Sequence, residues 1–156
     1  MKHLKLNDKA PAFESLDQHG GVFSSTTLIR KKFVLYFYPK DLTPGCTAQA
    51  CNLRDNYAEL QAQGIEIIGV SMDDANLHSR FISKYELPFT LLADTDRKVI
   101  ETFGVWGYKK FMGKEYEGIH RTTFVVNEAE TIIGIIDKPN TKDHTREILE
   151  IYANHK

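Results

Sequence analysis

The feature that most constrains the fold is an apolar and aromatic run that leads directly into a helix start. Phe33–Tyr38 is rich in β-branched and aromatic side chains and stops at Pro39, which predicts a buried strand. After a short turn, Thr43 and Pro44 predict a helix, with Thr43 at the N-cap and Pro44 as the first helical residue. A buried strand followed at once by a helix is typical of α/β domains.

The rest of the chain continues this alternation. Apolar residues at steps of three and four predict helices over Cys46–Leu60 (ended at Gly64), Leu77–Tyr85, Lys98–Phe103 and around Ile148–Tyr152. Short apolar runs predict strands at Ile65–Ser71 and Thr90–Leu92, and a hairpin made of Thr122–Val126 and Thr131–Ile136. This order favours an α/β fold with a mixed central sheet flanked by helices, which a thioredoxin-like arrangement fits.

Composition limits the classes of function. The 156 residues predict one domain spanning 1–156, and 20 Lys+Arg against 21 Asp+Glu disfavour nucleic acid as a partner. The apolar stretches are far shorter than the roughly 20 residues that a membrane-spanning helix needs, so no membrane span is expected. The N-terminus has no apolar export segment, so a soluble, cytoplasmic protein is expected. Because no apolar stripe demands a partner subunit, we expect a monomer.

Cys46 has an unusual position in the predicted helix. As the third helical residue it lies among backbone N–H groups without intrahelical partners, and these donors and the helix dipole favour a thiolate. Making a thiol largely ionised near neutral pH requires roughly 3.4 kcal/mol, whereas a helix end supplies about 0.3–1, at best about 2. A nearby cation is therefore expected, and Cys46 is the candidate nucleophile.

Cys51 is the second cysteine of the chain. On an intact helix it lies about 7.5 Å along the axis from Cys46 and about 140° around it. A disulfide needs Cα atoms within roughly 7 Å and converging Cβ vectors. Either the two thiols never bond, or the first turns of the helix unwind to let them.

Other site chemistries have weaker support. Two cysteines and six scattered histidines do not supply a four-ligand metal site, and no C-x-x-C motif or nucleotide-binding glycine pattern occurs, so no metal or cofactor is predicted. Ser71, Asp73 and Asp74 are expected to cap the next helix and not to form a triad. A disulfide reductase or electron carrier of thioredoxin fold, and a non-catalytic binding or metal-holding domain, stay open as alternatives to an enzyme with an activated thiol.

Residues Tyr36–Cys51, YFYPKDLTPGCTAQAC, resemble the peroxiredoxins and, within them, the bacterioferritin comigratory protein or peroxiredoxin Q class. The family pattern P-x-x-x-T-x-x-C is matched by Pro39, Thr43 and Cys46, and its closely following second cysteine by Cys51. The segments FGVWG (103–107) and KKFMGKEYEGIHRTTFVV (109–126) are also similar to this class, so the resemblance covers nearly the whole chain. Many members have Glu where this chain has Gln49, so no carboxylate role is carried over.

The resemblance implies a thioredoxin-like fold and the reduction of hydrogen peroxide and organic hydroperoxides by cysteine alone. Cys46 would be the peroxidatic nucleophile and become a sulfenic acid. Thr43 would position the peroxide, Pro39 would shape the pocket and shield the sulfenate, and Arg121 would supply the cation and hydrogen-bond donors. Cys51 would resolve the sulfenic acid as an intramolecular disulfide, which thioredoxin or glutaredoxin would reduce.

A further segment, Gly104–Gly118, is interpreted as a loop. It holds Trp106, Tyr108, Phe111, Met112 and Tyr116. These side chains either pack beneath a surface loop or form an apolar wall beside the thiolate. Because the segment closely precedes Arg121, we expect the fluorescence of Trp106 to report the redox state.

Overall fold

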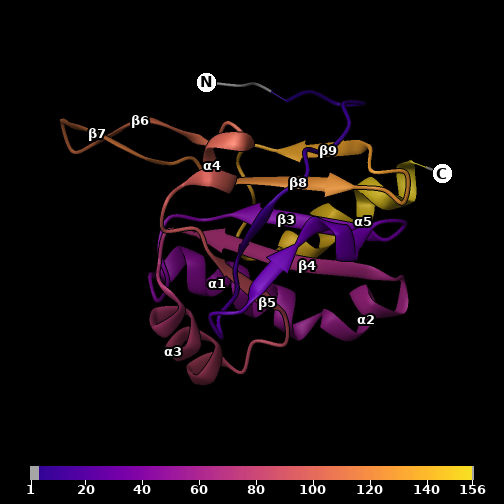
Figure 1. Cartoon of the computed structure of the whole chain (residues 1–156), viewed down its shortest axis with the longest axis horizontal. Helices are drawn as coiled ribbons and strands as arrows, with labels where there is room; N and C mark the ends of the chain where they lie inside the picture. The colour runs from indigo at the N-terminus through magenta and orange to yellow at the C-terminus, as the bar shows by residue number, and fades with distance from the viewer. Residues whose placement is uncertain (1–3, 156) are drawn as a thin grey trace.

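The strand predicted at Phe33–Tyr38 lies at the centre of a mixed sheet. In the computed structural model, which describes residues 4–155, β3 (Lys32–Phe37) pairs in parallel with β4 (Ile65–Ser71) and antiparallel with β8 (Thr122–Val126). Within residues 4–155, the sheet has seven strands in the order β2-β1-β5-β4-β3-β8-β9 (Figure 1). Its other strands are β1 (Glu14–Leu16), β2 (Val22–Ser24), β5 (Thr90–Ala93) and β9 (Ile132–Ile136). The predicted mixed sheet is therefore confirmed.

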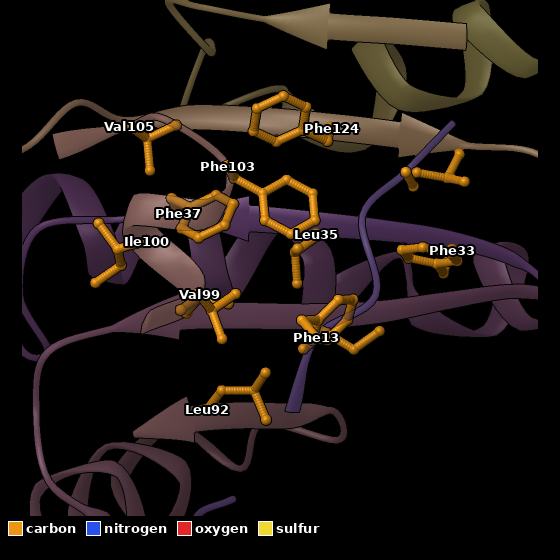
Figure 2. Close-up of a cluster of buried hydrophobic side chains, with 14 of the residues drawn as sticks. Phe13, Phe33, Leu35, Phe37, Leu92, Val99, Ile100, Phe103, Val105 and Phe124 are labelled. Carbon is orange, nitrogen blue, oxygen red and sulfur yellow. The ribbon is translucent and has the colours of Figure 1, made fainter. Parts of the chain in front are cut away.

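Alternate residues of β3 face two separate cores, as the period of two in a strand requires. Phe33, Leu35 and Phe37 point into the aromatic cluster, which also contains Phe13, Leu92, Val99, Ile100, Phe103, Val105 and Phe124 (Figure 2). Val34 and Tyr36 point into the helix-side cluster, which also contains Tyr38, Cys46, Ala50, Leu53, Leu60, Phe81, Ile148 and Tyr152. Burying one large apolar side chain, such as Leu or Phe, stabilises the fold by about 1.5–3 kcal/mol.

The helices divide between these two faces. The helix-side cluster receives residues from α1 (Pro44–Asp55), α2 (Tyr57–Ala62), α3 (Ala75–Tyr85) and α5 (His144–Asn154). The aromatic cluster receives Val99 and Ile100 from the short α4 (Lys98–Thr102), together with the segment around Phe13. A single 3₁₀ turn, Ser25–Leu28, follows β2. Cys46 thus belongs to the face of the sheet that the longer helices cover.

One predicted helix is two helices. The apolar stripe from Cys46 to Leu60 predicts a continuous helix, but α1 ends at Asp55 and α2 begins at Tyr57. Asn56 between them has φ −110° and ψ 14°, and its side-chain amide donates to the Asn52 carbonyl at 2.8 Å. A local side-chain bond of this kind competes with the regular helical ladder, which explains the break.

The segment 104–118 is not a loop. It forms a second sheet, the hairpin of β6 (Trp106–Phe111) and β7 (Lys114–Ile119), which projects from the body at the upper left of Figure 1. Met112 and Gly113 connect the strands with φ values of 53° and 79°, and positive φ at both central residues is the geometry of a type I′ turn. The loop expectation failed because methionine carries no signal for positive φ.

The expectation that the aromatic side chains of this segment pack beneath a surface loop is also wrong for most of them. Tyr108, Phe111, Met112 and Tyr116 are exposed, so they do not pack beneath a surface segment. Trp106, at the base of the hairpin, packs against the aromatic cluster and donates to Glu117 Oε2 at 2.9 Å. The apolar wall and the redox-sensitive fluorescence of Trp106 stay predictions.

The remaining expectations for the fold are largely confirmed. The helices and strands from β4 to β9 agree with the predicted ranges to within two residues, the 104–118 segment excepted, and α5 begins four residues before the predicted Ile148–Tyr152 and ends two residues after it. The pair β1 and β2 was not anticipated, because three-residue strands are too short to establish a period of two. Within residues 4–155, none of the helices combines the length and apolar character needed to span a membrane.

Candidate active site

The turn between β3 and α1 brings Thr43 to the start of the helix, as predicted. Thr43 has extended backbone angles at the N-cap and Pro44 is the first helical residue. The hydroxyl of Thr43 does not cap the helix; it donates to the carbonyl oxygen of Lys40 at 2.8 Å. Pro39 lies half-buried at the beginning of this turn. With its proton given to Lys40, Thr43 Oγ1 can serve only as an acceptor for a further hydrogen bond.

Cys46 is the third residue of α1 and only 2% exposed. Arg121 reaches it from the loop before β8, with Nη2 donating to Cys46 Sγ at 3.2 Å. This is the cation that the free-energy argument required beside the thiol. A hydrogen bond from a charged donor favours the thiolate over the thiol, in addition to the effect of the helix N-terminus.

Two neighbours on α1 fix the guanidinium of Arg121. Gln49 is fully buried and its Oε1 accepts from Arg121 Nη1 at 2.6 Å. Gly45 leaves the necessary space, because a Cβ at this position would lie only 3.3 Å from Arg121 Nη2. Within residues 4–155, Gln49 Nε2 has no hydrogen-bond partner, so the amide is oriented by Arg121 alone.

The strand register explains how residues 75 positions apart meet. β8 runs antiparallel to β3, with Thr122 paired to Phe37 at the end of β3. The residue that precedes β8 therefore lies at the same edge of the sheet as the residues that follow β3. Carboxyl ends of parallel strands are where α/β folds place their ligands, and Cys46 and Arg121 meet at this edge.

Cys51 lies on the same helix but in different surroundings. It is half-buried, and both cysteines are free thiols within one continuous helix. The next residue, Asn52, ties this part of α1 to the start of α5: its Nδ2 donates to the Lys142 carbonyl at 3.0 Å and its Oδ1 accepts from Thr145 N–H at 2.8 Å. The structure thus places Arg121 against Cys46, with Thr43 at the N-cap of the same helix, and Cys51 lies more than one turn further along that helix.

Lys109 is a second cation that sequence reasoning did not identify. From β6 it donates to the Ile119 carbonyl at 2.8 Å, two residues before Arg121, and its aliphatic chain lies over Gly118. Burial lowers the pKa of Lys109, the charge of Arg121 lowers it further, and Cys46 raises it. The spacing of apolar residues in the sequence did not point to Lys109, because the hairpin that carries it was not predicted.

One group of three residues in the described part of the chain could hold a metal ion. Ligand atoms of Asp41, Asp73 and His78 lie within 4.8 Å of one another, and neither cysteine belongs to the group. Asp41 and Asp73 already share hydrogen bonds with their neighbours. Of the three residues expected to cap α3, only Asp74 does so, accepting from Leu77 N–H at 2.9 Å; Asp73 turns instead to the backbone of Asp41.

These features define the class of the protein: a cysteine held as a potential nucleophile at a helix start, beside an arginine, on a mixed sheet. Comparison with known proteins agrees. Residues 6–135 match the model of the AhpC/TSA family. A bcp peroxiredoxin of Haemophilus influenzae is 49% identical over 96% of this chain and 97% of the relative, and peroxiredoxin Bcp of Escherichia coli K12 is 44% identical over 99% of each chain.

Solved structures give the same result. Peroxiredoxin Q of Xanthomonas campestris superposes with a TM-score of 0.85 at 29% identity, covering 92% of this chain and 90% of that one. The chain belongs to the AhpC/TSA family and is a thioredoxin-fold peroxiredoxin, an enzyme of the thiol peroxidase class. Within the family it is similar to the Bcp and peroxiredoxin Q proteins named above. Family membership favours the peroxidase over the disulfide reductase and the non-catalytic domain.

Proposed function

We propose that the chain reduces hydrogen peroxide and organic hydroperoxides with Cys46 as the peroxidatic residue and Cys51 as the resolving residue. The observation that carries this proposal is the contact of Arg121 Nη2 with Cys46 Sγ at 3.2 Å, at the first turn of α1. A cysteine that served only for packing would not need a guanidinium held against its sulfur by a second, buried side chain.

In the first step the Cys46 thiolate attacks the nearer peroxide oxygen. The new S–O bond forms as the O–O bond breaks, and the departing oxygen takes a proton to leave as water or an alcohol, so that Cys46 becomes a sulfenic acid. Arg121 stabilises the charge that develops on the two oxygens. Thr43 Oγ1 accepts a hydrogen bond from the hydroperoxide and so orients it. Pro39 limits the access of water to the pocket.

In the second step Cys51 attacks the sulfur of the Cys46 sulfenic acid. A disulfide forms and one water molecule leaves. Because both residues lie on one intact helix, α1 must unwind locally before the sulfur atoms can bond. The bond from Asn52 to the start of α5 opposes this unwinding.

An external dithiol completes the cycle by reducing the disulfide. We assign this role to thioredoxin, with glutaredoxin as the alternative, and we place the enzyme in the cytoplasm, because a cycle driven by thiol reductants needs a reducing compartment. Residues 1–156 would form one domain that acts as a monomer, since both cysteines of the cycle are on one chain.

The experiment is a count of free thiols after one equivalent of hydrogen peroxide, on wild type, Cys46→Ser and Cys51→Ser. We expect wild type to lose both thiols within seconds, Cys46→Ser to show no fast reaction, and Cys51→Ser to yield a sulfenic acid that can be trapped. Two slow, ordinary thiols in wild type would refute the peroxidase mechanism. Exchanging thioredoxin for glutaredoxin in a coupled turnover assay identifies the reductant.

A further inference from the structure

A buried polar cluster lies behind the turn that carries Thr43, and the proposed mechanism does not use it. Asp41, in that turn, is 3% exposed, and His78 on α3 is fully buried. Asp41 Oδ1 accepts from the hydroxyl of Tyr38 at 2.5 Å, and Asp41 Oδ2 lies 2.6 Å from His78 Nδ1. A carboxyl group buried this deeply requires a reason, because it is costly unless all of its oxygens are satisfied.

Both ring nitrogens of His78 and both carboxyl oxygens of Asp41 have hydrogen-bond partners. His78 Nε2 lies 2.9 Å from the Leu92 carbonyl oxygen on β5, and since a carbonyl only accepts, Nε2 carries a hydrogen. One further proton is shared between His78 Nδ1 and Asp41 Oδ2, either as an imidazolium with a carboxylate or as an imidazole with a carboxylic acid. In both forms the carboxyl of Asp41 is held at both oxygens, and the turn is thereby fastened to α3 and β5.

The turn needs this support. Leu42, between Asp41 and Thr43, has φ 65°, a left-handed backbone conformation that is unfavourable for an L-residue with a branched side chain. Leu42 is 39% exposed, so its side chain is only partly packed. Asp41 also donates its backbone N–H to Asp73 Oδ2 at 2.7 Å. The hydrogen bonds of Asp41 therefore maintain a conformation that the sequence at position 42 disfavours.

We propose that Asp41 and His78 are positioning residues for the oxidation of Cys46. They fix the turn so that Thr43 Oγ1 faces the peroxide and α1 starts with Cys46 at its third position, against Arg121. Neither residue touches the peroxide. This inference rests on the proposed function, because it concerns the rate of that first step.

The chain offers a matched control for a buried aspartate. Asp94 is 1% exposed and accepts from the backbone N–H groups of Val99 and Ile100 at 3.1 and 2.8 Å, at the start of α4. Its side chain holds the start of α4, whose Val99 and Ile100 belong to the aromatic cluster, and neither of these hydrogen bonds involves Asp41 or His78. We therefore expect Asp94→Ala to destabilise the protein while the side-chain hydrogen bonds of Asp41 and His78 stay in place.

The test measures the second-order rate constant of Cys46 with hydrogen peroxide in a Cys51→Ser background, with urea unfolding of every variant. We expect Asp41→Ala to lower the rate constant by about tenfold to a hundredfold. We expect Asp41→Asn to stay within about threefold of the parent, because the amide oxygen can accept from Tyr38 and the amide nitrogen can donate to neutral His78. Asp94→Ala should keep the parent rate constant.

Several outcomes would overturn the assignment. A folded Asp41→Ala variant with the parent rate, an Asp41→Asn variant as slow as Asp41→Ala, or an equal loss in Asp94→Ala would each contradict positioning through hydrogen bonds. If Asp41→Ala does not fold, Tyr38→Phe removes one donor alone, and the proposal requires a loss of about twofold to fivefold there; an unchanged rate would refute it. A parent that does not react rapidly with peroxide refutes the proposed function instead, so the two failures are distinguishable.

Discussion

The two cysteines of α1 lie in different surroundings, although they share one helix. Cys46, in the first turn, is buried and bonded to Arg121, whose guanidinium is held by Gln49. Cys51, more than one turn later, is half-buried, and its neighbour Asn52 ties the helix to the start of α5. The first turn is organised around charge and hydrogen bonding to sulfur, whereas the later part is organised around docking of the helix.

In the proposed mechanism, the oxidation of Cys46 and its resolution by Cys51 would depend on separate contacts. In a regular helix the Cα atoms of residues five apart are about 8–9 Å from each other, which exceeds the span of a disulfide. Under the proposed mechanism, the contacts at Cys46 would govern the rate of its oxidation in the intact helix, and the contacts at Asn52 would govern the opening that Cys51 needs. Variants at the two places should change different rate constants.

The largest effect is expected from Arg121. Replacing Arg121 by Gln removes the charge and the donor on Cys46 Sγ, and we expect the rate constant for oxidation by peroxide to fall by about 10²–10³-fold. Stopped-flow measurement in a Cys51→Ser background isolates this step. Arg121→Lys is the matched control, since it keeps the charge but loses the fork that also reaches Gln49, and it should be intermediate. A loss of less than threefold in Arg121→Gln would contradict the account.

The second prediction concerns Asn52. Asn52→Ala removes two hydrogen bonds to the segment before and at the start of α5, each worth about 0.5–1.5 kcal/mol, so opening of α1 becomes easier. We expect disulfide formation after oxidation to accelerate about fivefold or more, with oxidation itself unchanged. The matched control is Asn56→Ala, which loses a bond within the helical segment but none to α5. A disulfide that forms at the wild-type rate or more slowly in Asn52→Ala would exclude Asn52 as the restraint.

A smaller effect is expected from a substitution at Gln49. This substitution distinguishes the effect of charge near Cys46 from the effect of hydrogen bonding to Arg121. Gln49→Glu keeps an acceptor for Arg121 but adds a carboxylate that offsets part of the guanidinium charge beside Cys46. We expect oxidation at pH 7 to slow about threefold, and the loss to shrink as the pH rises. Gln61→Glu on α2 makes the same change where the side chain contacts Ile65, and should leave the rate unaltered. Faster oxidation in Gln49→Glu would contradict the claim that a positive charge beside Cys46 promotes its oxidation.

The smallest effect concerns His144 at the start of α5. Burial lowers the pKa of His144, hydrogen bonding and charge from Glu147 raise it, and the charge of Arg121 lowers it again, with a net lowering from the ordinary value of 6.5. Because the unfolded chain then binds the proton more readily, stability is complete above about pH 7 and declines as the pH falls through 6.5, by at most about 1.4 kcal/mol per unit.

Urea unfolding at pH 7.5 and 5.5 tests this sign. Replacing His144 by Asn removes the titrating ring, so the variant should lose less stability between the two pH values than wild type does. Equal losses in the two proteins would show that His144 does not contribute to the acid sensitivity of the fold.

Much of the fold could be predicted from the sequence, because long apolar periods and the Thr43–Pro44 helix start are local signals. The break at Asn56 could not, since it depends on a contact of this side chain with the Asn52 carbonyl. The hairpin of β6 and β7 also could not, because Met112 adopts a positive φ that its residue type does not indicate.

The sequence indicated which chemical groups the candidate site contains, but not how they are arranged in space. Cys46 followed from the helix start, and the need for a cation followed from free energies, but only the family resemblance pointed to Arg121. Its pairing with Cys46 depends on the register of β8 against β3, which periodicity does not specify. Asp41 and His78 are 37 residues apart and carried no local signal at all, because their roles exist only once β3, α3 and β5 are packed together.

The claim that α1 opens before Cys46 and Cys51 bond is tested by hydrogen exchange of α1. Exchange is measured by mass spectrometry before and after one equivalent of hydrogen peroxide. In the reduced protein, amides of residues 47–55 should be protected together with those of β3, since Thr47 is the first residue of α1 whose N–H has a helical partner. After a Cys46–Cys51 disulfide has been demonstrated, protection should be lost in α1 and retained in β3. A demonstrated disulfide with unchanged protection of α1 would contradict the claim that the helix must open before the two cysteines can bond.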